Sequence, residues 1–306
     1  MVRSGGEVGE SACSGQFMRA PLDPEEASRL LIEGYGRMAG AYDANVAPYH
    51  APIARRLLEL GRIGAEERVL DIGCGTGIAA LEAAATVDER GSVLGIDLAA
   101  PAVRLAVEKA AAMDLRQLRF DVMDSRAMRL PADSVDLVVS CFGHPLVGRD
   151  RCFAEVRRVL GPRGRFVLST WDATKSPGVP FREILERRRP RILAPDVARL
   201  IEARKVVAST DEGRATQSGD GWIRFLRNAG FSAVQAIEEI QPAVFRSPDA
   251  FLDYSFAWDD NERELRHMTP EGQEALRKEF RERVRTLMRK EGLVVDWPLR
   301  YFVVAR

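Results

Sequence analysis

From Arg68 onward, short apolar runs alternate with longer stretches in which apolar residues recur at helical spacing. The apolar runs lie at 69–73, 93–98, 118–123, 135–142 and 164–171, and the helical stretches between them at 77–87, 100–113 and 149–160. This alternation is typical of a mostly parallel sheet with helices on both faces. The near-continuous apolar run from Leu137 to Val139 fits a strand buried on both faces.

Helical patterns precede this segment. Asp23 is suited to cap a helix that has Pro24 at its first position. We expect residues 25–62 to be helical, with interruptions near Gly40 and Pro48.

The alternation breaks after Trp171. Residues 172–218 carry scattered prolines and a basic run from Arg187 to Arg191, and are expected to form an irregular or helical insertion. The pattern then predicts a helix at 219–229, a strand at about 232–240, mostly helical structure at 248–291, and a closing strand from Leu299 to Val304.

These patterns divide the chain into five parts. They are a disordered tail at 1–24, an N-terminal helical cover at 25–64, a ligand-binding α/β domain at 65–241 with the insertion at 172–218, a helical lid at 242–296, and a final strand at 297–306. The predicted fold class is α/β, with a doubly wound, Rossmann-like sheet.

Composition narrows the range of partners. Lys plus Arg and Asp plus Glu both number 45, so the net charge is zero, which disfavours a general binder of nucleic acid or anionic membranes. The sequence has no apolar run of membrane-spanning length and no apolar signal core at its start. The cysteines, Cys13, Cys74, Cys141 and Cys152, form no CxxC pair, so we expect free thiols and no metal site. We therefore expect a cytoplasmic protein with a small-molecule partner, and a homodimer is compatible with the sequence.

The clearest motif is VLDIGCGTG at 69–77, in which Gly73, Gly75 and Gly77 follow a buried strand and precede a helix. Glycines allow close approach of the backbone to a ligand, and the start of a helix offers free N–H groups. A dinucleotide site would use them for a pyrophosphate, and an S-adenosylmethionine (SAM) site for the methionine carboxylate. A tight turn with no ligand would also use such glycines.

Two carboxylates and one apolar residue favour SAM. The dinucleotide fingerprint GxGxxG is not met, because Ile78 follows GCGTG. Asp71, before the loop, would repel a pyrophosphate but suits a ligand with an ammonium and a sulfonium group. Asp97, at the end of the second strand, can accept hydrogen bonds from both ribose hydroxyls.

With these residues in place, the chain resembles the class I SAM-dependent methyltransferases, and within them the ubiquinone/menaquinone-biosynthesis-like small-molecule branch. The resemblance covers about residues 35–171, and 222–240 more loosely. The matching segments are RMAGAYD (37–43), VLDIGCGTG (69–77), VLGIDLA (93–99), VMDSRAMRLPADSVDLVVS (122–140) and EVRRVLGPRGRFVLSTW (155–171).

The resemblance implies a cofactor site. It implies that Gly73, Cys74 and Gly75 line the methionine end, that Asp97 holds the ribose, and that Leu98 packs on the adenine. It also implies that Asp124, with Ser125 beside it, accepts from the adenine amino group, that Cys141 lies near the SAM amine, and that Tyr42 covers the cofactor.

The resemblance also implies a seven-stranded sheet in the order 3-2-1-4-5-7-6 with the last strand antiparallel. The family often has Lys-Pro-Gly-Gly before strand five, whereas this chain has Gly-Pro-Arg-Gly at 161–164, which keeps the turn.

An oxygen or carbon acceptor usually requires removal of a proton, so we sought a base near the ends of strands four and five. His144, in CFGHP after strand four, is the candidate, and a loop histidine bonded to local backbone is the alternative. Trp171 and Asp172 could line the acceptor pocket. His50 and His267, in predicted helices, are interpreted as structural or exposed.

Aromatic residues recur in both helical parts. Tyr35, Tyr42 and Tyr49 recur every seven residues, for which core packing is the simpler interpretation. Tyr254 and Trp258 in the predicted lid are candidates for substrate contact, and packing of the lid on the sheet is the alternative.

The leading functional hypothesis is a SAM-dependent methyltransferase acting on an oxygen or carbon of a natural-product or quinone-like small molecule. Two alternatives stay open at this point. One is a SAM-binding relative that does not methylate, either a regulator or a cyclase- or lyase-like enzyme. The other is a nucleic-acid or protein methyltransferase, which is disfavoured because Cys141 to His144 stand where amino-methylating DNA enzymes often carry Asp/Asn-Pro-Pro-Tyr.

Overall fold

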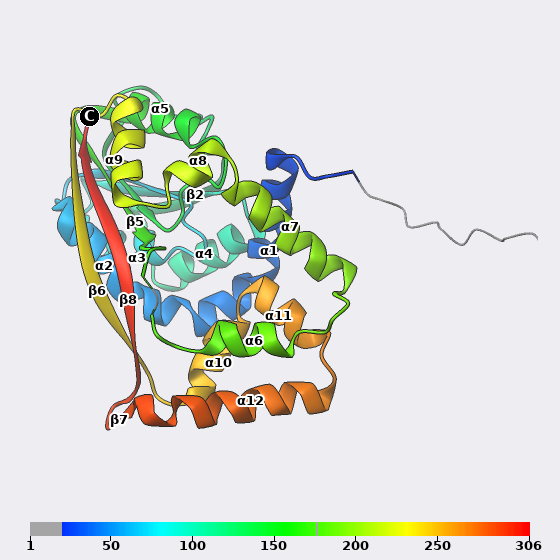
Figure 1. Cartoon of the computed structure of the whole chain (residues 1–306). Helices are drawn as coiled ribbons and strands as arrows, with labels where there is room; N and C mark the ends of the chain where they lie inside the picture. The colour runs from blue at the N-terminus through cyan, green and yellow to red at the C-terminus, as the bar shows by residue number, and fades with distance from the viewer. Residues whose placement is uncertain (1–19, 176) are drawn as a thin grey trace, which may run out of the picture.

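The computed structural model describes residues 20–175 and 177–306. Its centre is one sheet of eight strands in the order β3-β2-β1-β4-β5-β8-β6, with the short β7 pairing only with β8 (Figure 1). The strands are β1 (Arg68–Ile72), β2 (Ser92–Asp97), β3 (Leu118–Val122), β4 (Val135–Cys141), β5 (Leu160–Trp171), β6 (Ala233–Phe245), β7 (Met288–Arg289) and β8 (Gly292–Ala305).

The strand pairing confirms the predicted topology. Strands β1 to β5 pair in parallel, whereas β8 is antiparallel to both β5 and β6. With β8 counted as the seventh long strand, the order is the expected 3-2-1-4-5-7-6, and β7 is an additional two-residue strand. The Gly161–Gly164 segment, expected as a turn before strand five, is a bulge within β5 instead, because the register against β4 shifts between Val135 and Leu137.

Alternate residues of the central strands enter two different cores. On one face, Val69, Leu137 and Val139 pack with α2 (Ala47–Gly61) and α3 (Ile78–Ala84). On the other face, Leu70 and Val138 pack with α5 (Arg149–Val159) and α9 (Gly219–Asn228). Helix α4 (Ala100–Ala112) packs beside β2 and β3. These two cores account for the near-continuous apolar sequences of β1 and β4, because neither of these central strands has a face exposed to solvent.

Helix α1 (Pro24–Asn45) begins with the predicted cap, since the Asp23 carboxylate accepts a hydrogen bond from the Glu26 N–H at 2.8 Å. The predicted interruption at Gly40 is wrong, because α1 runs through it to Asn45 and a Cβ there would meet no neighbouring atom. The chain breaks at Val46 instead, and Pro48 stands in the first turn of α2, where it displaces no hydrogen bond.

The insertion after Trp171 is helical. It contains α6 (Phe181–Arg188), α7 (Pro195–Ala208) and α8 (Asp211–Ala215). Helix α7 packs along α1, so that two segments far apart in sequence lie side by side (Figure 1).

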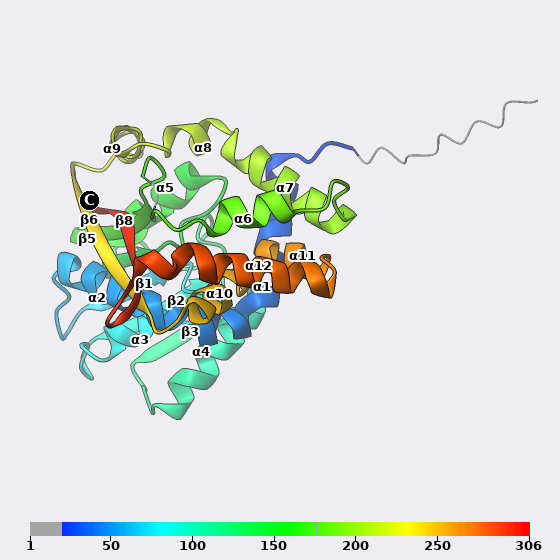
Figure 2. The ribbon, with the colours of Figure 1, turned by 60° about the horizontal axis from the view of Figure 1, so that its bottom comes forward.

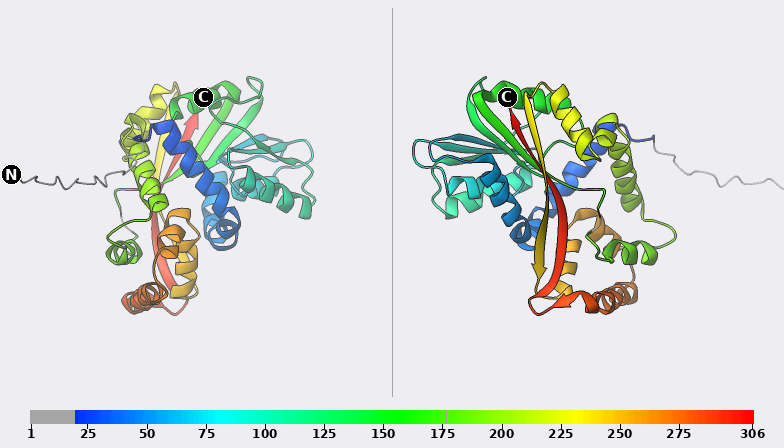
Figure 3. Two further views of the ribbon diagram at one scale, coloured as in Figure 1. Left: turned by 90° about the vertical axis from the view of Figure 1, so that its right-hand side faces the viewer. Right: turned by 60° about the vertical axis from the view of Figure 1, so that its left-hand side comes forward.

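The predicted lid boundaries of 242–296 and 297–306 are wrong in detail. Strand β6 continues to Phe245 and β8 begins at Gly292, so both strands extend as a long ribbon beyond the rest of the sheet (Figure 3). The lid helices, α10 (Pro248–Phe256), α11 (Asp259–Arg266) and α12 (Pro270–Val284), followed by the 3-10 turn η1 (Arg285–Leu287), occupy only the connection between them. Helix α12 lies against α6 (Figure 2), and Arg283 pairs with Glu183 across this contact at 2.7 Å.

Among the described residues, no helix is both long and apolar enough to cross a membrane. The same part of the chain holds no group of three or more histidine, cysteine or carboxylate side chains placed to bind a metal ion. The expected tail at 1–24 lies largely outside the described residues, as does Cys13.

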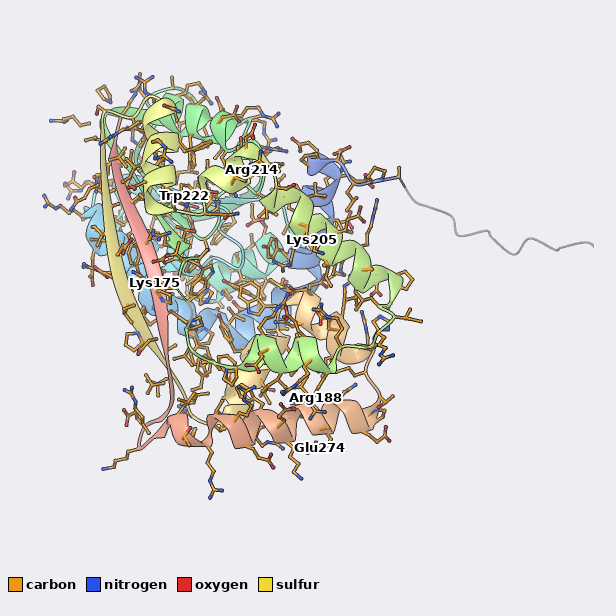
Figure 4. The ribbon with its side chains drawn as sticks, viewed as in Figure 1. Lys175, Arg188, Lys205, Arg214, Trp222 and Glu274 are labelled. Atoms are coloured by element: carbon orange, nitrogen blue, oxygen red, sulfur yellow. The ribbon has the colours of Figure 1, made fainter. Side chains whose placement is uncertain are left out.

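A buried ion pair joins the end of β5 to β8. Asp172 and Arg300 are only 2% and 4% exposed, and the guanidinium of Arg300 contacts the carboxylate of Asp172 directly. Lys175 lies beside the β6–β8 ribbon (Figure 4), with its ammonium 3.1 Å from Asp172 and 2.9 Å from Glu238. Asp172, which was expected to line an acceptor pocket, is therefore a structural ion-pair partner.

Removal of Asp172 will destabilise the fold, because it leaves the buried Arg300 without its main counter-charge. We expect Asp172→Ala to lower the free energy of unfolding by about 3 to 5 kcal/mol in a denaturant titration. The matched control is Arg283→Ala, which breaks an exposed pair and should leave the free energy of unfolding close to that of the wild type. Equal effects of the two substitutions would contradict the importance of the buried pair.

Candidate active site

A cavity of about 420 Å³ lies at the carboxyl ends of the parallel strands. Its floor consists of the loops after β1, β2, β3 and β4 together with the end of β5. Helix α1 covers it through Ile32, Tyr35, Met38 and Tyr42, and α7 adds Arg204. Ligands of open α/β sheets bind at this edge, where strand order reverses on either side of β1 and β4.

The glycine loop after β1 is in direct backbone contact with the loop after β4. Gly73 has φ of +66°, and a Cβ at this position would lie 2.0 Å from the carbonyl oxygen of Gly143. A Cβ on Gly143 would lie 2.3 Å from the carbonyl oxygen of Gly73. Only glycine fits at both positions, so the motif holds two loops together in addition to offering backbone to a ligand.

Gly77, the third glycine of the motif, does not line the cavity. It has φ of +90° at the start of α3, and a Cβ there would lie 2.8 Å from Phe120 and 3.2 Å from Ala106. Gly77 was expected to contact the cofactor, but the structure places it in the packing between elements. The absence of a side chain there allows α3 to begin close to β3 and α4.

Asp97 closes the glycine loop from the end of β2. Its Oδ2 accepts a hydrogen bond from the Gly75 N–H at 2.8 Å, and its Oδ1 accepts one from the Ala99 N–H at 2.8 Å. Burial raises the pKa of Asp97 above its ordinary value, although these backbone donors oppose the shift. Each carboxylate oxygen can accept a second hydrogen bond, so Asp97 can still receive ribose hydroxyls. Leu98 lies beside it in the cavity wall and is 40% exposed, as an adenine-packing residue requires.

Asp71 lines the cavity with an incompletely satisfied carboxylate. Its Oδ2 accepts from the Ala80 N–H at 3.0 Å, whereas Oδ1 is buried and accepts no hydrogen bond from the described residues. Burial, followed by repulsion from Asp97, raises the pKa of Asp71 to about 8. A buried acceptor without a donor is costly, so this oxygen fits a ligand that brings an ammonium group, as SAM does.

Asp124 and Ser125 line the far end of the cavity. Both Asp124 oxygens accept from the side chain of Arg126, at 2.9 to 3.1 Å, and Arg126 also donates to Glu25 on α1 at 2.8 Å. Burial raises the pKa of Asp124, but the hydrogen bonds from Arg126 outweigh burial and hold the pKa below its usual value. Arg126, which the sequence reasoning missed, therefore shares the carboxylate assigned to the adenine amino group. The adenine contact stays a prediction.

The cysteines of the cavity are protonated thiols. Burial raises the pKa of Cys141 to about 12 and that of Cys74 well above its ordinary value. Cys152 lies beneath the cavity and donates from Sγ to the Ser125 hydroxyl at 3.5 Å. All three are free, as predicted, and none is suited to act as a nucleophile at neutral pH.

Aromatic rings line the cavity at the ends of β4 and β5 and where the lid meets α1. Phe142 and Trp171 stack with ring centroids 4.6 Å apart and an interplanar angle of 15°. Trp258, from the lid, contacts Tyr42 edge to face at 5.6 Å. Tyr254, a candidate for substrate contact, does not line the cavity and stacks on Trp297 behind it. Packing of the lid therefore explains Tyr254, while Trp258 reaches the cavity as expected.

His144 lines the cavity with one ring nitrogen already engaged. Nδ1 lies 3.3 Å from Nε of Arg149, which can only donate, and 3.4 Å from the carbonyl oxygen of Pro145, the local backbone contact expected as the alternative. The ring packs edge to face on Trp222 at 4.9 Å. Burial, and next the charge of Arg149, lower the pKa of His144 to about 3. The adjacent guanidinium opposes protonation of this imidazole, so the proposed role as a base stays an untested prediction that the surroundings do not favour.

The other histidines differ from one another. His267 is partly exposed and lies 2.9 Å from Asp196, in agreement with its interpretation. His50 is 1% exposed, and it lines the cavity between the hydroxyls of Tyr42 at 3.2 Å and Tyr254 at 3.4 Å. The sequence does not predict this placement, because His50 follows a helix break whose angle local patterns do not specify.

The recurring tyrosines also separate. Tyr35 and Tyr42 belong to α1 and line the cavity, whereas Tyr49 belongs to α2 and stacks on Phe245 at 4.2 Å. The recurrence of these tyrosines every seven residues therefore does not place them on one face of a single helix.

Comparisons with known proteins match the central part of the chain to methyltransferases. The family model described as a methyltransferase domain matches residues 69–164. Nocamycin O-methyltransferase of Saccharothrix syringae is 35% identical over 136 residues, which are 44% of this chain and 49% of that protein. Demethylmenaquinone methyltransferase of Thermus thermophilus is 35% identical over 118 residues, which are 37% of this chain and 51% of that protein. The chain thus spans about half the length of the curated relatives that it matches.

Solved structures share the fold at lower identity. A putative methyltransferase from an antibiotic biosynthesis pathway of Anabaena variabilis superposes with a TM-score of 0.55 at 18% identity, covering 83% of this chain and 97% of that one. The YcgJ protein of Bacillus subtilis gives a TM-score of 0.51 at 21% identity, with the same two coverages. These similarities confirm the Rossmann-like architecture.

Replacement of Asp97 will weaken cofactor binding strongly, because the carboxylate both positions Gly75 and faces the ribose site. Each hydrogen bond to a charged group contributes about 1.5 to 3 kcal/mol, so we expect Asp97→Ala to lose at least about tenfold in affinity for S-adenosylhomocysteine by calorimetry. Asp121→Ala, on the exposed side of β3, is the matched control and should bind as the wild type does. Wild-type affinity in Asp97→Ala would remove the ribose assignment.

Ligand binding will depend on pH through Asp71. With a pKa of about 8, this carboxyl is largely protonated at pH 7, and an ammonium group beside it favours the ionised form. Binding of S-adenosylhomocysteine should therefore release a proton near pH 7, and affinity should rise with pH toward about 8 and then level off. Calorimetry in buffers of different ionisation enthalpy counts the protons released. Proton release that persists in Asp71→Asn would assign the effect to another group.

Proposed function

We propose that this chain, which carries a class I SAM-dependent methyltransferase domain, transfers a methyl group to an oxygen or carbon of a small, largely apolar natural-product or quinone-like acceptor. The observation that carries the proposal is the division of one cavity into a wall with carboxylates and a wall of aromatic rings. Bound SAM supplies an activated methyl group on a sulfonium, so the protein has mainly to position the acceptor and exclude water.

The carboxylate wall fits the cofactor. Asp71 offers an unpartnered acceptor for the ammonium, Asp97 offers accepting oxygens for the ribose, and the loop at Gly73 and Gly75 brings backbone close to the methionine end. Three carboxylates line the cavity: Asp71 lies within β1, Asp97 ends β2 and Asp124 follows β3. The rings that line the cavity at the ends of β4 and β5, Phe142 and Trp171, offer an acceptor an apolar contact surface.

The aromatic wall fits a flat apolar acceptor. Phe142 and Trp171 present stacked rings, and Trp258 and Tyr42 add an edge-to-face pair from the lid and from α1. Rings of this kind contribute large contact areas at low entropic cost. Two relatives are named nocamycin O-methyltransferase and demethylmenaquinone methyltransferase, and these names support a small-molecule acceptor. Coverage of the cavity by α1 disfavours a polymer as substrate.

Methyl transfer can be tested with purified protein and SAM that carries an isotopically labelled methyl group. A panel of hydroxyquinones, phenols and polyketide-like enols is incubated with both, and mass spectrometry detects the labelled product. We expect at least one acceptor to gain the label together with stoichiometric S-adenosylhomocysteine. Tight binding of SAM without transfer to any member of the panel would instead favour a binding protein that does not methylate.

Trp171 should act on the acceptor and not on the cofactor. We expect Trp171→Ala to raise the KM for the acceptor roughly tenfold or more, since loss of a buried aromatic contact costs about 1.4 kcal/mol or more. The affinity for S-adenosylhomocysteine, measured by calorimetry, should stay within about twofold of the wild type. Loss of affinity for S-adenosylhomocysteine with an unchanged KM for the acceptor would show that Trp171 contacts the cofactor and not the acceptor.

A further inference from the structure

A hydrogen-bonded chain of three side chains runs from the cavity into the protein. Tyr42 Oη lies 3.2 Å from Nδ1 of His50, and Nε2 of His50 lies 3.4 Å from Tyr254 Oη. The three residues come from α1, α2 and α10, so they meet only in the folded protein. Tyr42 and His50 line the cavity, while Tyr254 lies behind them.

His50 is surrounded by aromatic rings and by no formal charge. The rings of Phe142, Trp171, Trp258 and Trp297 lie with centroids 5.3 to 6.3 Å from the imidazole. The other titratable groups that face the pair are the Tyr254 hydroxyl on α10 and the Cys141 thiol on β4, which are both neutral. Tyr35 and Asp43 act on Tyr42 from the same helix. Burial alone lowers the pKa of His50 to about 3.

This environment distinguishes His50 from His144. The imidazole of His144 receives a hydrogen bond from the buried guanidinium of Arg149, which occupies Nδ1 and repels an added proton. His50 has only hydroxyl partners. A hydroxyl can both donate and accept, so the Tyr42–His50 contact can reverse its direction, whereas the Arg149–His144 contact cannot.

We propose that Tyr42 is the catalytic residue that contacts the reacting hydroxyl of the acceptor and that His50 is the positioning residue that orients Tyr42 and takes up its proton. The inference rests on the proposed methyl transfer. With the imidazole proton on Nε2 donated to Tyr254, the bare Nδ1 accepts the Tyr42 hydroxyl proton. The lone pairs of Tyr42 Oη then face the cavity and accept a hydrogen bond from the acceptor O–H.

The proton and charge balance follows from this arrangement. As the acceptor oxygen forms its bond to the methyl carbon, its proton passes to Tyr42 Oη and the Tyr42 proton passes to Nδ1 of His50. The carbon–sulfur bond of the cofactor breaks with its electron pair on sulfur. One positive charge therefore disappears at sulfur and one appears on the imidazole, so the total charge in the cavity does not change. The imidazolium loses its proton to water when the product leaves.

The decisive measurement is ligand binding, which does not depend on turnover. The probes are 2-naphthol, which has a hydroxyl donor, and 2-methoxynaphthalene, which has the same rings without it. Their affinities for the protein saturated with S-adenosylhomocysteine are measured by fluorescence titration. A neutral hydrogen bond contributes about 0.5 to 1.5 kcal/mol, so the wild type should prefer the naphthol roughly two- to twelvefold.

Three substitutions separate the two roles. Tyr42→Phe and His50→Phe keep a ring in place and should abolish the preference while leaving the affinity for the methyl ether unchanged. His50→Asn places an amide oxygen near the position of Nδ1, so it should keep the preference but accept no proton. With the acceptor found in the labelling experiment, His50→Asn should lower kcat roughly a hundredfold or more without a change in KM. Tyr49→Phe, outside the cavity, is the matched control and should behave as the wild type in every assay.

The outcomes are exclusive. Equal losses for both probes in Tyr42→Phe would show a packing role and overturn the inference, as would an unchanged preference or no saturable binding of naphthol by the wild type. Full kcat in His50→Asn would overturn the proton-accepting role of His50. A Tyr42-dependent preference in a protein that methylates nothing would leave the hydroxyl site standing and remove the proposed function alone.

Discussion

The contact between the backbones of Gly73 and Gly143 determines the geometry of the whole site. These residues belong to the loops after β1 and β4, the two central strands, and no side chain fits between them. The contact fixes where Asp71, inside β1, stands relative to Cys141 and Phe142, at the end of β4. The carboxylate wall and the aromatic wall of the cavity are therefore held at one separation by two residues without side chains. Phe142 itself has φ of +59°, a conformation that few non-glycine residues adopt, so the same loop stores some backbone strain at the cavity edge.

Burial also sets the protonation states of the titratable groups in the cavity. Burial keeps Cys74 and Cys141 as thiols, keeps His50 and His144 neutral, and favours the protonated form of Asp71. Asp124 differs, because the hydrogen bonds from Arg126 hold its pKa below the usual value. An incoming cation therefore favours ionisation of Asp71 in particular, and a low local dielectric strengthens that attraction.

Much of this arrangement could be predicted from the sequence, and the reasons differ by element. The central strands β1 and β4 were evident because burial on both faces makes each of them an apolar run, and the site residues Asp71, Gly73 and Asp97 were found because they lie within or next to strands. Tyr42 and Trp258 were found through resemblance and lid position. The misassignments concern tertiary contacts. Gly77 packs on Phe120, Asp172 pairs with Arg300, and His50 reaches the cavity only because α2 leaves α1 at Val46. Phe120 and Arg300 are far in sequence from Gly77 and Asp172, and the angle between α1 and α2 at Val46 is set by tertiary packing, so no local pattern could reveal these placements.

Helix α1 gives the site an unusual property. It carries Tyr42, it covers the cavity, and it is bound to the far end through Glu25 and Arg126 and to the lid through Arg37 and Asp259. A ligand that binds beneath it therefore contacts a helix that also supplies part of the reactive surface. A movement of α1 away from the sheet would open the cavity to ligand exchange and to water together. The ion pairs at the two ends of α1 oppose such a movement. Because salt screens ion pairs, higher ionic strength should favour exchange of ligands.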